Sequence, residues 1–290
     1  MKNLRKIIGW SVFAAGLLVF LYPQCLLLYM DISMQRVIDA YNIQLKTLDT
    51  DAIYREMEHY NGTLSQGTHK KARDPFDSNS PGDIAQMLAL DEDTVLGYID
   101  IPKIGQLLPI YMGASSKHLS KGVGVIDSTS LPLGGESTHA VIAGHRGYAY
   151  APFFRNLNDL EPGDIFHIQM FGQTLTYRIF EKEVIQPTQV EKLEIVQGRD
   201  LVTLLTCHPF RVNTHRLLVK GERLFLPVGK EDPHSPEPRD DPVEKNGAAW
   251  KILSNPFMRY RLANRIFVAA GVALFMLAIA GIIRNVIRGR

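Results

Sequence analysis

One thiol stands out among the residues that could do chemistry. The chain has two cysteines: Cys25 lies within a long apolar run near the N-terminus, and Cys207 lies in a more polar region far from it. The two apolar runs described below predict that Cys207 lies outside the cell, where a lone thiol is prone to oxidation. Nucleophilic catalysis would explain why a thiol is present there. The alternative is that Cys207 is a small buried hydrophobic residue, which is what most free cysteines are.

The surroundings of Cys207 favour a catalytic role. The segment Thr203-Leu-Leu-Thr-Cys207 is typical of a buried strand, and Pro209 prevents regular pairing beyond it. A thiol attacks a carbonyl as the thiolate, so it needs a base or a cation nearby. His145, in Ala-Gly-His-Arg-Gly at the end of an apolar run, is a candidate base, and Arg216, nine residues after the thiol, is a candidate cation on a returning strand.

Three other histidines compete for the role of base. His208 follows the thiol and His215 precedes the arginine, but adjacent strand residues point to opposite faces, so each faces away from its catalytic neighbour. His139 lies six residues before His145, which is about 20 Å in extended chain, so only one of the two can serve the thiol. The glycines that flank His145 permit close approach and make it the better site.

The elements that must position these residues read as strands. Short segments rich in branched and aromatic residues alternate with Gly and Pro turns, a pattern typical of a β-barrel or β-sandwich. These segments are residues 96–101, 107–112, 140–143, 166–170, 175–185, 201–206 and 216–220. Before them, apolar residues between positions 37 and 60 recur at helical spacing, and residues 61–81 are polar and read as an exposed loop.

Two apolar runs are long enough to cross a membrane. Residues 7–30 follow a basic N-terminus and lack the small-x-small site of a cleaved signal peptide, so we expect an uncleaved anchor. Residues 266–283 form a second run of eighteen uncharged residues, for which the alternative is a buried helix. The positive-inside rule then predicts that both termini are cytoplasmic and that residues 31–258 lie outside.

Composition argues against several other classes of function. Lys and Arg number 32 and Asp and Glu 30, and the basic residues are scattered, which argues against nucleic-acid binding. The nine histidines are dispersed and form no metal-binding motif, so we expect neither a metal nor another cofactor.

Taken together, these motifs resemble the sortase family. Residues 203–207 match its Thr-Leu-x-Thr-Cys signature, and His145 and Arg216 fall at its catalytic histidine and arginine. The similarity runs from about residue 97 to residue 221. It implies a mainly β fold built on a closed eight-stranded barrel. It also implies a cysteine transpeptidase that cuts a Leu-Pro-x-Thr-Gly-like sorting signal between Thr and Gly through a thioester.

Within that family, Asp74-Pro75-Phe76 resembles the lid of the class C, pilus-polymerising sortases of Gram-positive bacteria, although Asp-Pro alone could start a turn or helix. The resemblance implies that Asp74 faces Arg216 and that Phe76 covers Cys207. It also implies pilin subunits, with sorting signals and acceptor lysines, as partners. The chain departs from the class where His-Pro-Phe follows Cys207 in place of Thr-Pro-Tyr.

The expected organisation follows from these segments. We expect an anchor over 1–30, a helical section with the lid loop over 31–90, a catalytic barrel over 91–229, a Pro- and charge-rich linker over 230–258, and a second span with a basic tail over 259–290. Three alternative functions remain open: a housekeeping sortase that anchors proteins to a cell-wall precursor, a hydrolytic cysteine peptidase, and a noncatalytic membrane scaffold that binds pilins.

Overall fold

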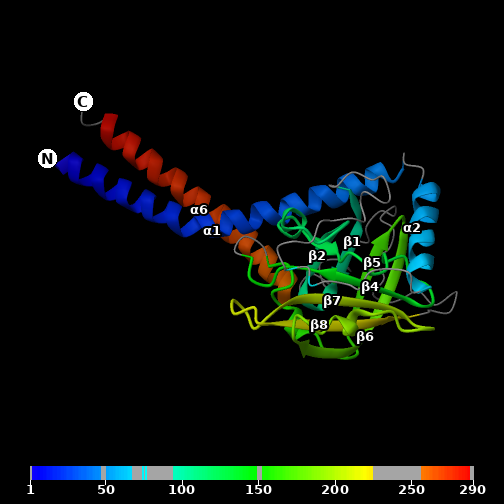
Figure 1. Cartoon of the computed structure of the whole chain (residues 1–290). Coiled ribbons are helices and arrows are strands. Elements are labelled where there is room, and N and C mark those ends of the chain that lie inside the picture. The colour runs from blue at the N-terminus through cyan, green and yellow to red at the C-terminus, as the bar shows by residue number, and fades with distance from the viewer. Residues whose placement is uncertain are drawn as a thin grey trace. The chain divides into compact units, whose positions relative to one another are not determined.

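The computed structural model describes residues 2–46, 50–66, 74, 76, 94–148, 152–224 and 256–287 (Figure 1). The chain forms two compact units, one made of residues 1–33 and 243–290 and the other of residues 34–242. Most of the expected lid loop and of the expected linker lies outside the described residues.

The larger unit is built on a closed barrel of eight strands. In order around the barrel, the strands are β1-β2-β3-β4-β7-β8-β6-β5, and this confirms the closed eight-stranded fold. Their bounds are Val95–Ile101 for β1, Gln106–Tyr111 for β2, Val123–Val125 for β3, Thr138–Ala143 for β4, Ile165–Met170 for β5, Gln173–Ile185 for β6, Asp200–His208 for β7 and His215–Arg223 for β8. Short helices η1 (Pro102–Ile104), α4 (Ser116–Leu119), η2 (Leu157–Asp159) and η3 (Val190–Leu193) lie between them.

The strands at the centre of the site are buried on both faces. Every residue of β4 is buried, and so is every residue of β7 except the last. Strand β7 pairs in parallel with β4 on one side and antiparallel with β8 on the other. Because both neighbours fix its register, the end of β7 is a rigid place for a reactive side chain.

Helix α2 (Thr50–Ser65) corrects one expectation. The exposed loop was expected to begin at residue 61, but the helix continues to Ser65, and Asn61 and Leu64 on it are buried. The Asn61 amide donates to the Leu131 carbonyl at 2.9 Å and accepts from the Leu131 backbone N–H at 2.7 Å. A polar residue that looked loop-forming in sequence therefore supplies the helix with its hydrogen-bonded contact to the barrel.

The smaller unit contains most of two long apolar helices. Helix α1 (Lys2–Gln44) runs through the expected boundary at residue 30 without interruption, and α6 (Pro256–Ile287) contains the second apolar run. By length and composition, Leu4–Gln44 and Leu262–Ile287 are candidate membrane spans. Within this unit, Phe20 meets Phe267 edge to face, and Arg265 forms an ion pair with Asp31 at 3.0 Å.

Candidate active site

Cys207 and Arg216 lie directly opposite each other on β7 and β8. Their relative exposures are 9% and 7%, whereas His208 and His215, the next pair in the register, are less buried and belong to the other face. The alternation expected from the sequence therefore holds at this hairpin. It separates the thiol and the guanidinium from the two neighbouring histidines.

His145 is brought to the same end of the barrel by the segment after β4. The last residue of β4, Ala143, pairs with Leu205. Gly144 then donates to the Leu205 carbonyl at 3.0 Å and accepts from the Thr206 hydroxyl at 2.6 Å. One residue further along, His145 continues this parallel register toward the level of Cys207.

Gly144 also explains why the residue before His145 is small. A Cβ at this position would lie 2.7 Å from the ring of Phe154, which is inside contact distance. The Phe154 backbone N–H in turn donates to the His145 carbonyl at 3.1 Å. The close approach that the flanking glycines predicted is therefore that of an aromatic ring against the His145 segment.

Burial leaves both the thiol and the imidazole in their uncharged forms. Burial raises the pKa of Cys207, nearby Arg216 lowers it, and nearby Asp74 raises it again. Burial also lowers the pKa of His145. The net shifts make the neutral thiol and neutral imidazole the dominant pair at neutral pH.

Asp74 lies against the guanidinium of Arg216. The Arg216 Nε and Nη2 donate to the two Asp74 carboxylate oxygens at 2.9 and 2.5 Å, and both side chains are largely buried. Arg216 Nη1 donates to the carbonyls of Asn213 and His215, each at 2.9 Å. The guanidinium is thus bound in two directions, by the expected lid on one side and by its own hairpin on the other.

Phe76 packs over the same residues. Its ring centroid lies 5.8 Å from that of His145 and 5.3 Å from the guanidinium carbon of Arg216. It also packs against a buried apolar cluster that includes Ala143 and Leu205. These contacts place Phe76 at the mouth of the site, and direct cover of Cys207 stays a prediction.

His139, one of the rival bases, has a different set of partners. Its Nδ1 donates to the Glu194 carbonyl at 2.8 Å, and its Nε2 accepts from the Thr203 hydroxyl at 2.7 Å. Burial lowers the pKa of His139 to about 4. Both ring nitrogens are therefore used structurally: Nδ1 joins β4 to the segment after η3, and Nε2 joins β4 to β7.

The sequence did not indicate the contacts of two residues that closely follow His145 in the chain. Tyr148 stacks on the His145 ring with centroids 5.7 Å apart and an angle of 4° between the planes. Arg146 Nη1 lies 2.6 Å from His208 Nδ1. Tyr148 and Arg146 sit within three residues of His145, and that proximity in sequence was the only available signal.

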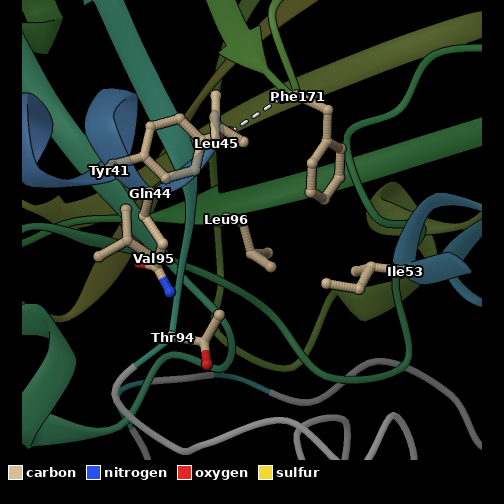
Figure 2. A pocket seen from close by; sticks show the side chains of 8 residues that line it. All are labelled: Tyr41, Gln44, Leu45, Ile53, Thr94, Val95, Leu96 and Phe171. Carbon is tan, nitrogen blue, oxygen red and sulfur yellow. Dashed lines mark hydrogen bonds between the residues drawn. The ribbon is translucent and has the colours of Figure 1, made fainter. Parts of the chain in front are cut away.

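Two further observations concern other places where a metal ion or a ligand could bind. Among the described residues, no group of three or more His, Cys, Asp and Glu side chains could hold a metal ion. A mainly apolar pocket lies in the same unit and contains none of Cys207, His145 and Arg216 (Figure 2). It is lined by Tyr41, Gln44, Leu45, Ile53, Thr94, Val95, Leu96 and Phe171, and the Phe171 N–H donates to the Tyr41 hydroxyl at 2.9 Å.

The chain is similar to known proteins over the region that carries this geometry. The sortase domain family matches residues 99–224. Among curated proteins, sortase D of Bacillus subtilis is 28% identical over 131 residues, which cover 44% of this chain and 63% of that protein. The chain therefore spans somewhat less than two thirds of that relative's length.

Similar solved structures extend the match beyond the barrel. Sortase C of Streptococcus pneumoniae, whose structure is described as informative on pilin substrate specificity, is 36% identical with a TM-score of 0.60; the alignment covers 66% of this chain and 97% of that one. Sortase C of Clostridium perfringens, solved with the C-terminal cell wall sorting motif, is 38% identical with a TM-score of 0.58, and the match covers 66% and 99% of the two chains.

Proposed function

This chain belongs to the sortase family of cysteine transpeptidases, and on that premise we propose that it is a lidded, membrane-anchored enzyme that polymerises pilins. Its substrate is a Leu-Pro-x-Thr-Gly-like sorting signal, and the acceptor is a lysine amine of a pilin subunit. The observation that carries the proposal is the cross-strand pair Cys207 and Arg216, with His145 in the adjoining segment and Asp74 bound to the guanidinium.

Acylation needs Arg216 to exchange its partner. Once Asp74 leaves, the guanidinium is free to donate to the oxyanion or to the substrate backbone, and its charge favours the Cys207 thiolate. The Cys207 thiol passes its proton to His145, and the resulting thiolate attacks the threonine carbonyl. The carbon–nitrogen bond to glycine then breaks, and the His145 imidazolium gives that proton to the departing amine. The product is a thioester on Cys207 and a neutral His145.

Transfer to the acceptor reverses the use of His145. A neutral lysine amine attacks the thioester carbonyl, and His145 accepts the proton that the amine loses as the isopeptide bond forms. The carbon–sulfur bond breaks, and Cys207 leaves as the thiolate. The ion pair of the first step is thereby restored for the next acylation.

Three observations support the class C assignment and the membrane topology. Asp74 and Phe76 both contact Arg216, and Phe76 also contacts His145, as expected of a lid. The similar sortases C include one described for pilin substrate specificity and one solved with a sorting motif. Candidate spans lie at both ends of the chain, so a barrel outside the cell requires both termini in the cytoplasm.

The test uses the full chain in detergent with a sorting-signal peptide and candidate pilins. We expect a thioester on Cys207 and, with pilins present, covalent ladders that resist denaturant. The Cys207→Ala variant should form neither product. Cleavage without ladders would contradict pilin polymerisation and favour hydrolysis or cell-wall anchoring, and lack of any acyl-enzyme would contradict the assigned nucleophile.

A further inference from the structure

The residues that immediately follow His145 and Cys207 are bonded to each other. Arg146 Nη1 lies 2.6 Å from Nδ1 of His208, and the two residues are 62 positions apart in sequence. A guanidinium has only donors, so the Nδ1 of His208 must be the acceptor. The contact therefore requires His208 to be neutral, with its ring proton on Nε2.

This contact lies where the barrel stops supporting His145. Strand β4 ends at Ala143, and of residues 144–148, the described part of the segment that follows, Gly144 is the last whose backbone bonds to β7. Beyond it, the Phe154 N–H donates to the His145 carbonyl and Arg155 Nη2 donates to the Tyr148 carbonyl at 2.9 Å, while Arg146 bonds to His208. The Arg146–His208 hydrogen bond, called the tie below, therefore connects this segment directly to β7, the strand that carries Cys207.

The Arg146 guanidinium is incompletely satisfied by hydrogen bonds. Its Nε is buried and has no hydrogen-bond partner among the described residues. Burial lowers the pKa of Arg146, and the charge of Asp159 in η2 opposes that effect. A guanidinium with one buried, unsatisfied nitrogen depends strongly on the hydrogen bonds that it does make.

We propose that Arg146 and His208 are positioning residues for the transpeptidation chemistry, and that protonation of His208 releases the His145 segment from the strand of Cys207. This inference rests on the proposed function for its catalytic consequence, although the tie itself exists independently of it. The proton sensitivity requires a histidine at position 208, because its Nδ1 is the acceptor of the hydrogen bond.

The charges that face His208 keep the tie intact at neutral pH. The pKa of His208 is lowered by burial first, then by Arg146 from the segment after β4 and by His215 from β8. Since a lowered pKa means that protonation needs more acid, the contact is present at neutral pH and is lost on acidification. Asp159 acts on the pair through Arg146.

Three variants distinguish the effect of the Arg146–His208 hydrogen bond from the effect of protonating His208. In His208→Asn, the amide oxygen can accept where Nδ1 does but does not titrate. In His208→Ala, the acceptor is removed at every pH. In His215→Asn, the neighbouring imidazole on β8 is removed while Arg146 keeps its partner.

The direct readout is hydrogen exchange of residues 144–147 in the full chain in detergent. At about pH 8 we expect exchange in His208→Ala to be about tenfold faster than in the wild type, since a charge-assisted hydrogen bond is lost. At about pH 5 the wild type should approach His208→Ala, while His208→Asn stays protected. Rates are compared between variants at one pH, so the intrinsic pH dependence of exchange cancels.

The catalytic readout is the cleavage of a sorting-signal peptide. We expect His208→Ala to lower kcat about tenfold with KM nearly unchanged, and the ratio of His208→Asn to wild-type activity to rise as pH falls. His215→Asn should keep an acid response, moved to higher pH, because the charge of His215 no longer lowers the pKa of His208. Equal exchange in His208→Ala and wild type, or an acid response unchanged in His208→Asn, overturns the inference; a wild type with no cleavage contradicts the proposed function alone.

Discussion

Cys207 lies in an environment that opposes its own ionisation. Burial raises the pKa of its thiol, and Asp74 raises it further, both by its own charge and by occupying the Arg216 guanidinium. The neighbouring guanidinium is the group that favours the thiolate. In the proposed lid, the Asp74 carboxylate would therefore have two effects: it would block access to Cys207, and it would neutralise the cation that favours the thiolate.

Replacement of Asp74 by asparagine should separate these two effects. Asp74→Asn keeps the size of the side chain but removes its charge, so the pKa of Cys207 should fall. We expect modification of Cys207 by a small thiol reagent to become about tenfold faster near neutral pH, which corresponds to a pKa change of about one unit. Labelling is read by peptide mass spectrometry, because Cys25 also carries a thiol.

Two further variants serve as comparisons. Phe76→Ala should raise the labelling rate by the same factor at every pH, because an aromatic ring blocks access without adding charge. Asp164→Asn removes a carboxylate that pairs with Lys103 far along the chain from the lid, and it should change nothing at Cys207. An unchanged labelling rate in Asp74→Asn would count against the lid.

Arg216 should be essential to the chemistry but not to the fold. Arg216→Ala is expected to lower kcat/KM for a sorting peptide by about 100- to 1,000-fold, as for loss of an oxyanion donor. Because that variant leaves Asp74 buried without its partner, the double variant with Asp74→Asn is the proper reference for stability. Near-normal turnover in either variant would contradict the assigned role.

At the scale of elements, the sequence predicted strands better than it predicted their ends and contacts. Seven apolar segments correspond to seven of the eight strands, but β3 was missed. Its three residues are too few to show a period, and Gly124 in it passes so close to Gly113 that a Cβ would lie 2.3 Å from that carbonyl oxygen. Such a close backbone contact between separate segments has no signature in a single sequence.

The features of the candidate site also differ in whether the sequence alone could predict them. Strand parity in the β7–β8 hairpin, and hence the choice of Cys207 and Arg216 over their histidine neighbours, could be argued from alternation alone. The tie between Arg146 and His208 could not, because it joins the ends of two strands that are paired only in the folded barrel. Periodicity describes one element at a time, whereas loop contacts depend on which elements become neighbours.

His139 should make the barrel less stable in acid. It joins β4 to Thr203 of β7 and to the segment after η3, and its pKa is lowered by burial to about 4 from 6.5. The unfolded chain therefore binds the proton more readily, so the stabilising effect is full above about pH 6.5 and is lost as pH falls toward 4. Between about pH 7.5 and pH 5.5, we expect unfolding to become easier by about 1 kcal/mol from this residue.

The measurement is denaturant unfolding of the barrel at the two pH values. His139→Asn should be less stable than the wild type at neutral pH, because one or both hydrogen bonds are lost, but it should lack this acid-dependent component. His59→Asn, which removes an exposed histidine on α2, should retain the wild-type pH dependence. Equal pH dependence in the wild type and His139→Asn would contradict the assignment.

At the scale of the whole molecule, the two apolar helices pack against each other within the smaller unit. Their apolar runs were predictable from hydropathy, but their mutual packing was not. Gly271 of α6 lies against Leu21 of α1, with a Cβ position 2.4 Å from the leucine methyl, and Gly281 lies against the ring of Trp10 at 3.0 Å. Small residues that let two helices approach closely are typical of association inside a bilayer.

A larger side chain at Gly271 should therefore weaken the packing of α6 against α1. In Gly271→Leu, the added atoms overlap Leu21, so the helices must separate or shift. The full chain, with a protease site inserted near residue 240 and a tag at the N-terminus, is cut in detergent, and retention of the α6 fragment is measured. We expect Gly271→Leu to lower retention about tenfold relative to the wild type, which corresponds to about 1.4 kcal/mol.

Gly16→Leu is the matched control, because no described atom lies within 4 Å of the Cβ position at Gly16. If both variants retain the fragment equally well, the small residues do not hold the helices together, and the Phe20–Phe267 contact and the Asp31–Arg265 ion pair at 3.0 Å are the next contacts to test.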